Sequence, residues 1–144
     1  MPKPPYTRSS DGTIHQGKTL TSTQVSLGLN GQRLASIALE MGAFLRFEDA
    51  TIGISAPFRL TVNSESQHLD PEVGSTLGPL LAIAPGTLQS ALITPTLTLR
   101  LEFADGAVIE VVEHPSFEAW EIAGPGSRRI ICPPAGGDGL SVWL

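Results

Sequence analysis

The sequence predicts a mainly β fold with little helix, arranged as an antiparallel sheet, a sandwich or a partly open barrel. Short apolar stretches alternate with polar residues at a period of two, the side-chain spacing of a half-buried strand. Turn dipeptides such as Asn30-Gly31 and Asp105-Gly106 separate these stretches. The 144 residues include 15 glycines and 12 prolines, and only 16% are charged, which favours short strands joined by turns. We expect about nine strands, plus one or two short helices around 71–84.

The length fits one domain with its own hydrophobic core. Residues 1–23 are polar, rich in Pro, Ser, Thr and Gly, and show no periodicity. We therefore expect a flexible arm, or a loose first hairpin around Asp11-Gly12. A single β-rich domain is expected over 24–144.

The first half of this domain is expected to form an antiparallel meander with one buried face. Asn30-Gly31 follows an alternating stretch and predicts a type I′ hairpin into the next strand. Strands are expected at 25–29, 34–39 and 44–47, followed by a run in which Ile52 and Ile54 lead into 57–62.

The helical segment is expected to begin at Asp70, an N-cap, with Pro71 in the first helical position. Gly78-Pro79 interrupts it, because proline lacks the backbone donor and its ring clashes with the preceding turn. We expect a short turn, then a second short helix over 79–83.

The last third is again strand-like, and Asp105-Gly106 predicts a hairpin. Thr96 to Phe103 alternates throughout its length, whereas His114-Pro115-Ser116 breaks the pattern. Two glycine-rich loops, 124–127 and 133–139, join the final strands. Strands are expected at 88–93, 96–103, 108–112, 120–122, 128–132 and 140–143.

The composition limits which binding partners and which cellular compartment we expect for the protein. The net charge of −5 argues against a nucleic-acid partner and leaves a protein partner or a homodimer. No stretch approaches the roughly 20 apolar residues of a membrane span. The single cysteine, Cys132, and the lack of a signal peptide predict a cytoplasmic protein.

His114 and Glu118 belong to the densest polar constellation of the chain. On a helix they would share one face, which is the geometry of a metal or acid–base site. However, Pro115 biases His114 towards extended backbone, and alternating glutamates on strands usually face solvent. A surface ladder followed by a turn is the favoured interpretation. The other carboxylates of the constellation are Glu110, Glu113 and Glu121.

The remaining candidates also have structural interpretations. Arg128 and Arg129 follow a glycine-rich loop that could present amides to an anion, but a strand follows where a phosphate cradle needs a helix. Cys132 is expected at a buried strand end. Trp120 and Trp143 are expected in the core, or as interface anchors if exposed. No catalytic residue, metal ligand or cofactor is assigned.

Two expectations about single side chains can be checked against a structure. We expect Trp120 to be buried. Glu118 is expected to bond to the backbone or to an arginine such as Arg128.

The C-terminal half carries a series of short motifs: Glu118-Ala119-Trp120, Gly124-Pro125, Cys132-Pro133, Gly136-Gly137 and the final Leu140-x-Val142-Trp143. In these motifs it resembles a family of small actinobacterial proteins of unknown function. It covers roughly 25–144 and departs from the family pattern at Pro133-Pro134-Ala135 and Asp138. It implies a compact intracellular domain without implying an activity. In style, such proteins are similar to the immunity proteins of bacterial toxin systems.

Three functions follow as hypotheses. The favoured one is a non-enzymatic interaction or immunity-type accessory domain that uses sheet edges. The second is a small-molecule-binding domain with a pocket between the sheet and the short helices, lined by Phe58, Leu99 and Trp120. The third, less favoured, is a hydrolase or metal site that uses His114 with Glu118 or Glu113.

Overall fold

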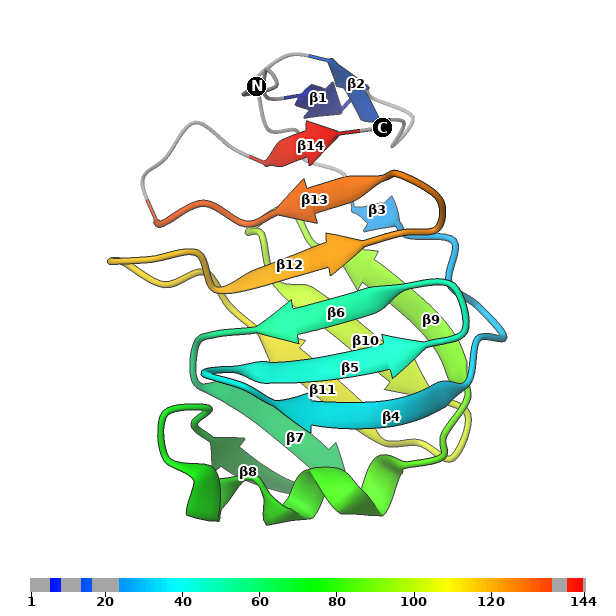
Figure 1. The fold of residues 1–144 in the computed structure, drawn as a ribbon, viewed down its shortest axis with the longest axis vertical. Coiled ribbons are helices and arrows are strands. Elements are labelled where there is room, and N and C mark those ends of the chain that lie inside the picture. Colours follow the sequence, from blue (N-terminus) through cyan, green and yellow to red (C-terminus); the bar gives the residue numbers. More distant parts are fainter. Residues whose placement is uncertain (1–5, 9–13, 17–23, 136–139, 144) are drawn as a thin grey trace.

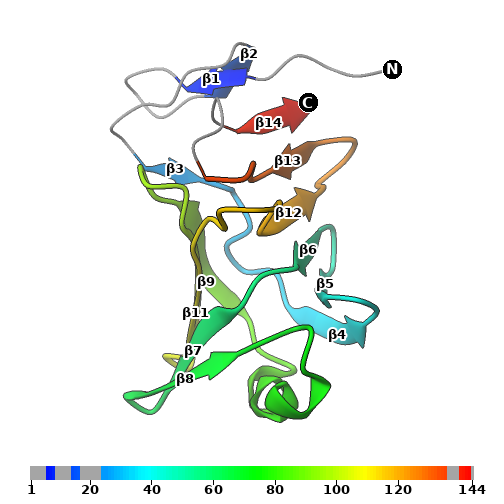
Figure 2. The ribbon, with the colours of Figure 1, turned by 90° about the vertical axis from the view of Figure 1, so that its left-hand side faces the viewer.

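Two six-stranded antiparallel sheets form the two layers of a sandwich in the computed structural model of the protein (Figures 1 and 2). The structure describes residues 6–8, 14–16, 24–135 and 140–143. The fold is mainly β, as the sequence predicted. Of the three arrangements expected, the sandwich is the one that forms.

The strands of each sheet come from distant parts of the chain. Sheet I has the order β3 (Val25–Ser26), β9 (Leu88–Ile93), β10 (Leu99–Phe103), β11 (Val108–Val111), β7 (Phe58–Val62) and β8 (Glu65–Leu69). Sheet II has the order β14 (Ser141–Trp143), β13 (Arg129–Ile131), β12 (Trp120–Ala123), β6 (Thr51–Ile54), β5 (Ala43–Phe47) and β4 (Leu34–Leu39). Two 3₁₀ helices, η1 (Gly74–Thr76) and η2 (Gly78–Ile83), connect β8 to β9.

In the N-terminal segment, β1 (Tyr6–Arg8) and β2 (Ile14–Gln16) pair antiparallel, which agrees with the hairpin alternative. The expected turn at Asp11-Gly12 lies outside the described residues, and so does 136–139 of the last glycine-rich loop. In the described part of the chain, no helix is both long and apolar enough to cross a membrane.

The two main sheets contain twelve strands, compared with about nine expected. β8 is a strand that the pattern did not predict, because four of its five residues are polar and exposed. It pairs with β7 through a tight turn in which Asn63 and Ser64 both have positive φ. Backbone pairing to β7 therefore makes this strand, without help from apolar alternation.

The expected hairpin at Asn30-Gly31 is wrong. A turn does form there, with Gln32 N donating to Leu29 O at 3.1 Å. However, β3 pairs with β9 and β4 pairs with β5, so the turn carries the chain from sheet I to sheet II. The dipeptide sets the local backbone, whereas burial of the apolar faces between the sheets decides which strands pair.

Asp70 does not cap a helix, which corrects a second expectation. Its Oδ1 accepts from Glu72 N at 2.9 Å and its carbonyl accepts from Val73 N at 2.9 Å, so it shapes a turn. η1 begins after Val73 with no side-chain cap. The helix expected over 79–83 does form, as η2, with Pro79 in its first turn.

The core lies between the sheets and is built from alternating strand residues. Leu99, Leu101 and Phe103 of β10 face inward and are buried, as predicted. Phe103 stacks on Phe47 of the opposite sheet, with 6.4 Å between ring centroids. β10 begins at Leu99 and not at Thr96, because Leu97 takes a positive φ of 62° in a turn.

Candidate functional site

The His114–Glu118 segment forms bends between β11 and β12, so these two side chains do not share a helix face. His114 Nδ1 accepts a hydrogen bond from Ser116 N at 3.0 Å. The imidazole stacks on Phe117 with 3.7 Å between centroids. One imidazole nitrogen and one ring face are therefore occupied within the turn itself.

Glu118 is exposed, and the expected bond to Arg128 is wrong. Arg128 Nε donates to Gly124 O at 3.1 Å, and its NH1 donates to Leu27 O at 2.9 Å. Its NH2 is buried without a hydrogen-bond partner, and this burial lowers the pKa of the guanidinium. Arg128 thus ties the β12–β13 turn to the segment that follows β3.

Position 124 requires glycine, because another part of the chain approaches its backbone closely. Its φ is +90°, and a Cβ at this position would lie 2.3 Å from Asp49 O. Neighbouring Arg129 pairs with Glu121 at 2.8 Å. The glycine-rich turn at 124–127 is therefore a structural hairpin, as the favoured interpretation had it.

Trp120 is buried, as predicted, with 1% of its surface exposed. Its Nε1 donates to Leu97 O at 3.1 Å. Cys132 is also fully buried, and burial raises the pKa of its thiol to about 12. Both side chains thus belong to the core, whereas Trp143 on β14 is half-buried.

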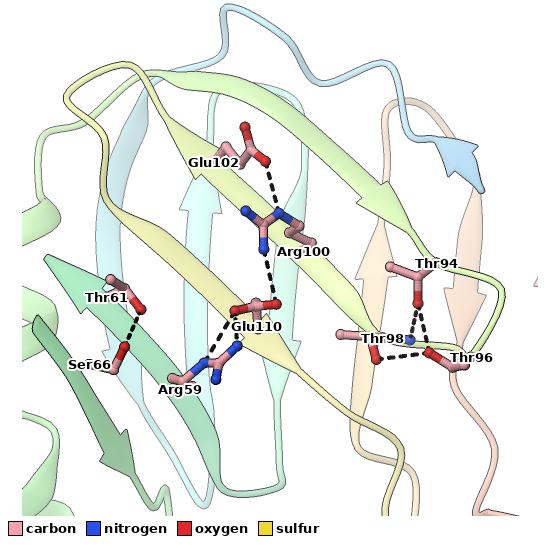
Figure 3. A network of polar contacts seen from close by, with 9 residues as sticks. All are labelled: Arg59, Thr61, Ser66, Thr94, Thr96, Thr98, Arg100, Glu102 and Glu110. Atoms are coloured by element: carbon pink, nitrogen blue, oxygen red, sulfur yellow. Dashed lines mark hydrogen bonds and ion pairs between the residues drawn. The ribbon is translucent and has the colours of Figure 1, made fainter. Parts of the chain in front are cut away.

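The outer face of sheet I carries a ladder of charged side chains (Figure 3). In the strand register, Arg100, Glu110 and Arg59 lie opposite one another on β10, β11 and β7. Glu110 is bonded to Arg59, and its other oxygen lies 3.0 Å from Arg100 NH1. Arg100 Nε also donates to Glu102 at 2.8 Å.

The ladder shifts the pKa values of Glu110 and Arg100. The hydrogen bond from Arg59 holds the pKa of Glu110 below its usual value, and the charge of Arg100 acts in the same direction. The hydrogen bond to Glu102 raises the pKa of Arg100. Two arginines and two glutamates thus compensate one another, so this face offers little uncompensated charge to a ligand.

A depression of about 250 Å³ lies beside the ladder. Phe58 lines it, whereas Leu99 and Trp120 are buried in the core and do not. No residue of the two 3₁₀ helices contributes to its lining, so it is not the pocket expected between the sheet and the short helices. The lining consists of Pro57, Phe58, Arg59, His68, Thr98, Glu110 and Val112.

A second hollow, of about 200 Å³, lies between β4 and the two 3₁₀ helices. We call it the β4 groove. Its lining is apolar side chains and glycines: Ile37, Leu39, Gly74, Leu77, Gly78, Leu80 and Leu81. Figures 1 and 2 show its setting, with the helices beyond the β4 edge of sheet II.

Exposed apolar side chains gather at this groove. Leu39 is 56% exposed and Leu81 is 73% exposed. Fully exposed Met41 lies two residues after the end of β4, and Val73, 47% exposed, precedes η1. Among the described residues, Val112 is the one other large apolar side chain of this exposure, and it lies at the sheet I depression.

The sequence interpretation missed this surface. Ile37 and Leu39 were expected in a strand with one buried face, and Leu81 was placed in a helical apolar cluster. One signal was available: at three residues per 3₁₀ turn, Leu80 and Ile83 share a face, so Leu81 must point elsewhere. Within the described ranges, no group of three or more His, Cys, Asp or Glu side chains is placed to hold a metal ion.

The fold and its surfaces define a two-layer antiparallel β-sandwich with a compensated polar face and an apolar groove at one sheet edge. The model of a family of unknown function (DUF6188) matches residues 25–143, and the chain belongs to that family. No curated protein and no solved structure matches the chain.

Proposed function

We propose that the protein is a non-enzymatic protein-interaction domain and that the β4 groove is its docking surface. One observation carries the proposal. Of the five exposed large apolar side chains in the described part of the chain, Leu39 and Leu81 line this groove, and Met41 and Val73 lie within two residues of the lining residues Leu39 and Gly74 in the sequence. Exposed apolar side chains are ordinary when scattered, whereas gathered ones mark interaction sites.

The groove suits a protein segment better than a small molecule. Its volume of about 200 Å³ is below the 300 to 1,000 Å³ typical of ligand pockets. Its lining supplies no charged or hydroxyl side chain to orient a ligand. The adjacent β4 is an edge strand, and edge strands offer backbone hydrogen bonds to another chain.

The other hypotheses receive less support. The depression on sheet I contains Arg59 and Glu110, but these are already paired to each other. His114 Nδ1 already accepts a hydrogen bond from Ser116 N, so Nε2 is the one ring nitrogen left to bind a metal ion or a substrate. A small-molecule site and a hydrolytic or metal site therefore rank below the interaction surface.

We further propose a cytoplasmic location and an actinobacterial origin. The single, buried Cys132 supports the first, because a reducing compartment does not require disulfides. The Glu118-Ala119-Trp120 and terminal Val142-Trp143 signature supports the second. An immunity-type role is one form that such an interaction domain would take.

Site-specific photo-crosslinking in the native cells tests the interaction. Leu81 is replaced by p-benzoylphenylalanine, and the matched control carries the same residue at exposed Val112, away from the groove. We expect a discrete covalent adduct from position 81 and none from position 112. The adduct should disappear when Leu39→Lys is added. Equal adducts at both positions, or none at position 81, would contradict the proposal.

A further inference from the structure

We infer that Asn30 is a deamidation site that the folded chain keeps closed, and that its side chain reacts when the turn around it opens. The reaction converts the carboxamide of Asn30 to a carboxylate and yields isoaspartate as well as aspartate. It requires water and no enzyme. A chain in which this turn has opened and reacted therefore carries a permanent chemical mark. This inference is independent of the docking function.

The residue pair Asn30-Gly31 has the features that make an asparagine reactive. Asn30 is exposed, so solvent reaches its carboxamide. Gly31 has no side chain, so its backbone nitrogen can approach that carboxamide closely. The chain's other asparagine, Asn63, is followed by Ser64, whose side chain crowds the same approach. Asn30 is therefore the asparagine at which we expect the reaction.

The reaction is an intramolecular substitution followed by hydrolysis. After the Gly31 N–H loses its proton to hydroxide, the nitrogen attacks Cγ of Asn30 and a C–N bond forms. The Cγ–Nδ2 bond breaks, and Nδ2 leaves as ammonia after it takes a proton from water. Water then opens the resulting succinimide ring at one of its two carbonyl carbons. Opening at the main-chain carbonyl gives isoaspartate, and opening at Cγ gives aspartate.

Hydrogen bonds within the turn oppose this attack. Gly31 N donates to Leu88 O at 2.8 Å, so the proton that must leave is already engaged. Gln32 N donates to Leu29 O at 3.1 Å, and Leu88 N donates to Gln32 O at 2.9 Å. These bonds hold the backbone around Gly31 and resist the rotation that would bring its nitrogen to Cγ of Asn30. The reaction therefore depends on opening of the turn.

The position of the turn favours local opening over unfolding of the whole domain. It follows β3, the two-residue edge strand of sheet I, and Asn30 and Gly31 are both exposed. Fully buried Leu29 on one side and the bonds to Leu88 on the other anchor it. Exposed segments with few anchors open at a lower free energy than the core. Loss of the Leu29 anchor should therefore increase the population of the open turn.

Isoaspartate would prevent the turn from closing as before. It places one additional atom in the main chain between Leu29 and Gly31. Because Leu29 is fully buried and Gly31 is bonded to Leu88, the lengthened turn displaces one of these two anchors. The new carboxylate also adds one negative charge to a chain with a net charge of −5. The modified chain is thus less stable and more acidic, and ion exchange separates it from the original.

Incubation of the full chain at pH 8, beside a terminally blocked peptide of residues 27–33, tests the inference. Mass spectrometry of a proteolytic digest measures conversion at Asn30. We expect the folded chain to react more slowly than the peptide by about tenfold or more, which corresponds to a local opening free energy of about 1.4 kcal/mol or more. Hydrogen exchange of the Gly31 amide should show protection of the same order. Asn30→Ser should abolish the more acidic species.

Two matched variants separate local opening from global unfolding. Leu29→Ala removes the buried anchor of the turn and should raise the rate at Asn30 severalfold. Val142→Ala shortens an equally buried side chain on β14, at the opposite edge of sheet II from β4, and should leave the rate unchanged. Circular dichroism checks that both variants remain folded.

The wild-type chain in urea gives a second measurement that does not depend on the variants. Below the unfolding transition, a reaction through local opening keeps a nearly constant rate, whereas a reaction through global unfolding accelerates steeply. Equal rates in the folded chain and the peptide would overturn the inference, and so would no reaction in the peptide. Equal acceleration by the two variants, or a steep rise with urea below the transition, would also overturn it.

Discussion

At the level of single residues, Trp120 and Cys132 meet at one backbone carbonyl. Trp120 Nε1 donates to Leu97 O at 3.1 Å, and Cys132 Sγ lies 3.9 Å from the same oxygen. Leu97 is itself held in a turn of positive φ before β10. This corner therefore joins the start of a sheet I strand to two segments of sheet II.

Removing the indole should open a large cavity at this corner. We expect Trp120→Ala to lower the free energy of unfolding by about 3 to 5 kcal/mol. Trp120→Phe keeps a ring but loses the bond to Leu97 O, so its cost should be smaller. Urea unfolding of both variants measures the difference. Near-wild-type stability of Trp120→Ala would contradict the burial of this side chain.

The raised pKa of Cys132 links stability to alkaline pH. In the unfolded chain the thiol ionises near its usual value of 9.0, whereas in the folded chain it stays neutral up to about 12. The free energy of unfolding should therefore fall as pH rises between these values, by up to about 1.4 kcal/mol per pH unit.

Urea unfolding at pH 7 and pH 10 measures this dependence. Cys132→Ala should show a shallower loss of stability over the same range, because it removes the titrating group. A pH dependence identical in the two proteins would contradict the buried thiol. Loss of the side chain lowers stability at both pH values, so only the pH difference is compared.

The burial of Trp120 and Cys132 could be predicted from the sequence, because both lie in strand-like apolar stretches. The role of Arg128 could not. Its partners are the backbone carbonyls of Gly124 and of Leu27, which lies 101 residues away in the chain. Every residue has a backbone carbonyl, so residue types do not reveal these two partners. The glycine-rich loop before Arg128 indicated a hairpin turn, with an anion site as the less favoured alternative.

Among the structural elements, β10, β11 and β7 are linked by the charged ladder as well as by backbone pairing. We expect Glu110→Gln to lower stability by about 1 kcal/mol, because Glu110 contacts both Arg59 and Arg100. Glu102→Gln is the matched control and should cost less, since Glu102 contacts Arg100 alone. Thermal unfolding at pH 7 compares the two, and equal losses would contradict the ladder.

The same ladder should make stability sensitive to acid. The pKa of Glu110 is lowered in the folded chain, so its contribution is present above the unfolded value of 4.5. It is lost as pH falls through the folded pKa. Glu110→Gln should therefore lose less stability than the wild type between pH 6 and pH 3, which urea unfolding would measure.

Strands with apolar alternation, such as β7, β9 and β11, were predicted close to their actual bounds. β8 was not, because it depends on pairing with β7 and carries no apolar pattern. The β4 groove could not be predicted from the sequence either. Exposure of Leu39 and Leu81 depends on β4 being the last strand of sheet II, and strand order is a property of the whole fold.

On the scale of the whole molecule, sheets I and II are complete without the N-terminal segment. All their strands begin at or after Val25, and the family match spans residues 25–143. We expect a chain of residues 24–144 to fold with a melting temperature within about 4 °C of the full chain, the effect of roughly 1 kcal/mol. Loss of cooperative unfolding would show that residues 1–23 are part of the domain.

The strand order has a consequence for how the chain reaches this state. Val25 pairs beside Ile93, and Ile54 pairs beside Trp120, so both sheets depend on partners far along the sequence. Such non-local topologies fold in milliseconds to seconds. On the ribosome, β6 must wait on the order of several seconds for β12 to be made. During that wait β6 can pair with β5, but its other edge has no partner strand. This nascent stage is where the protein would benefit most from a chaperone.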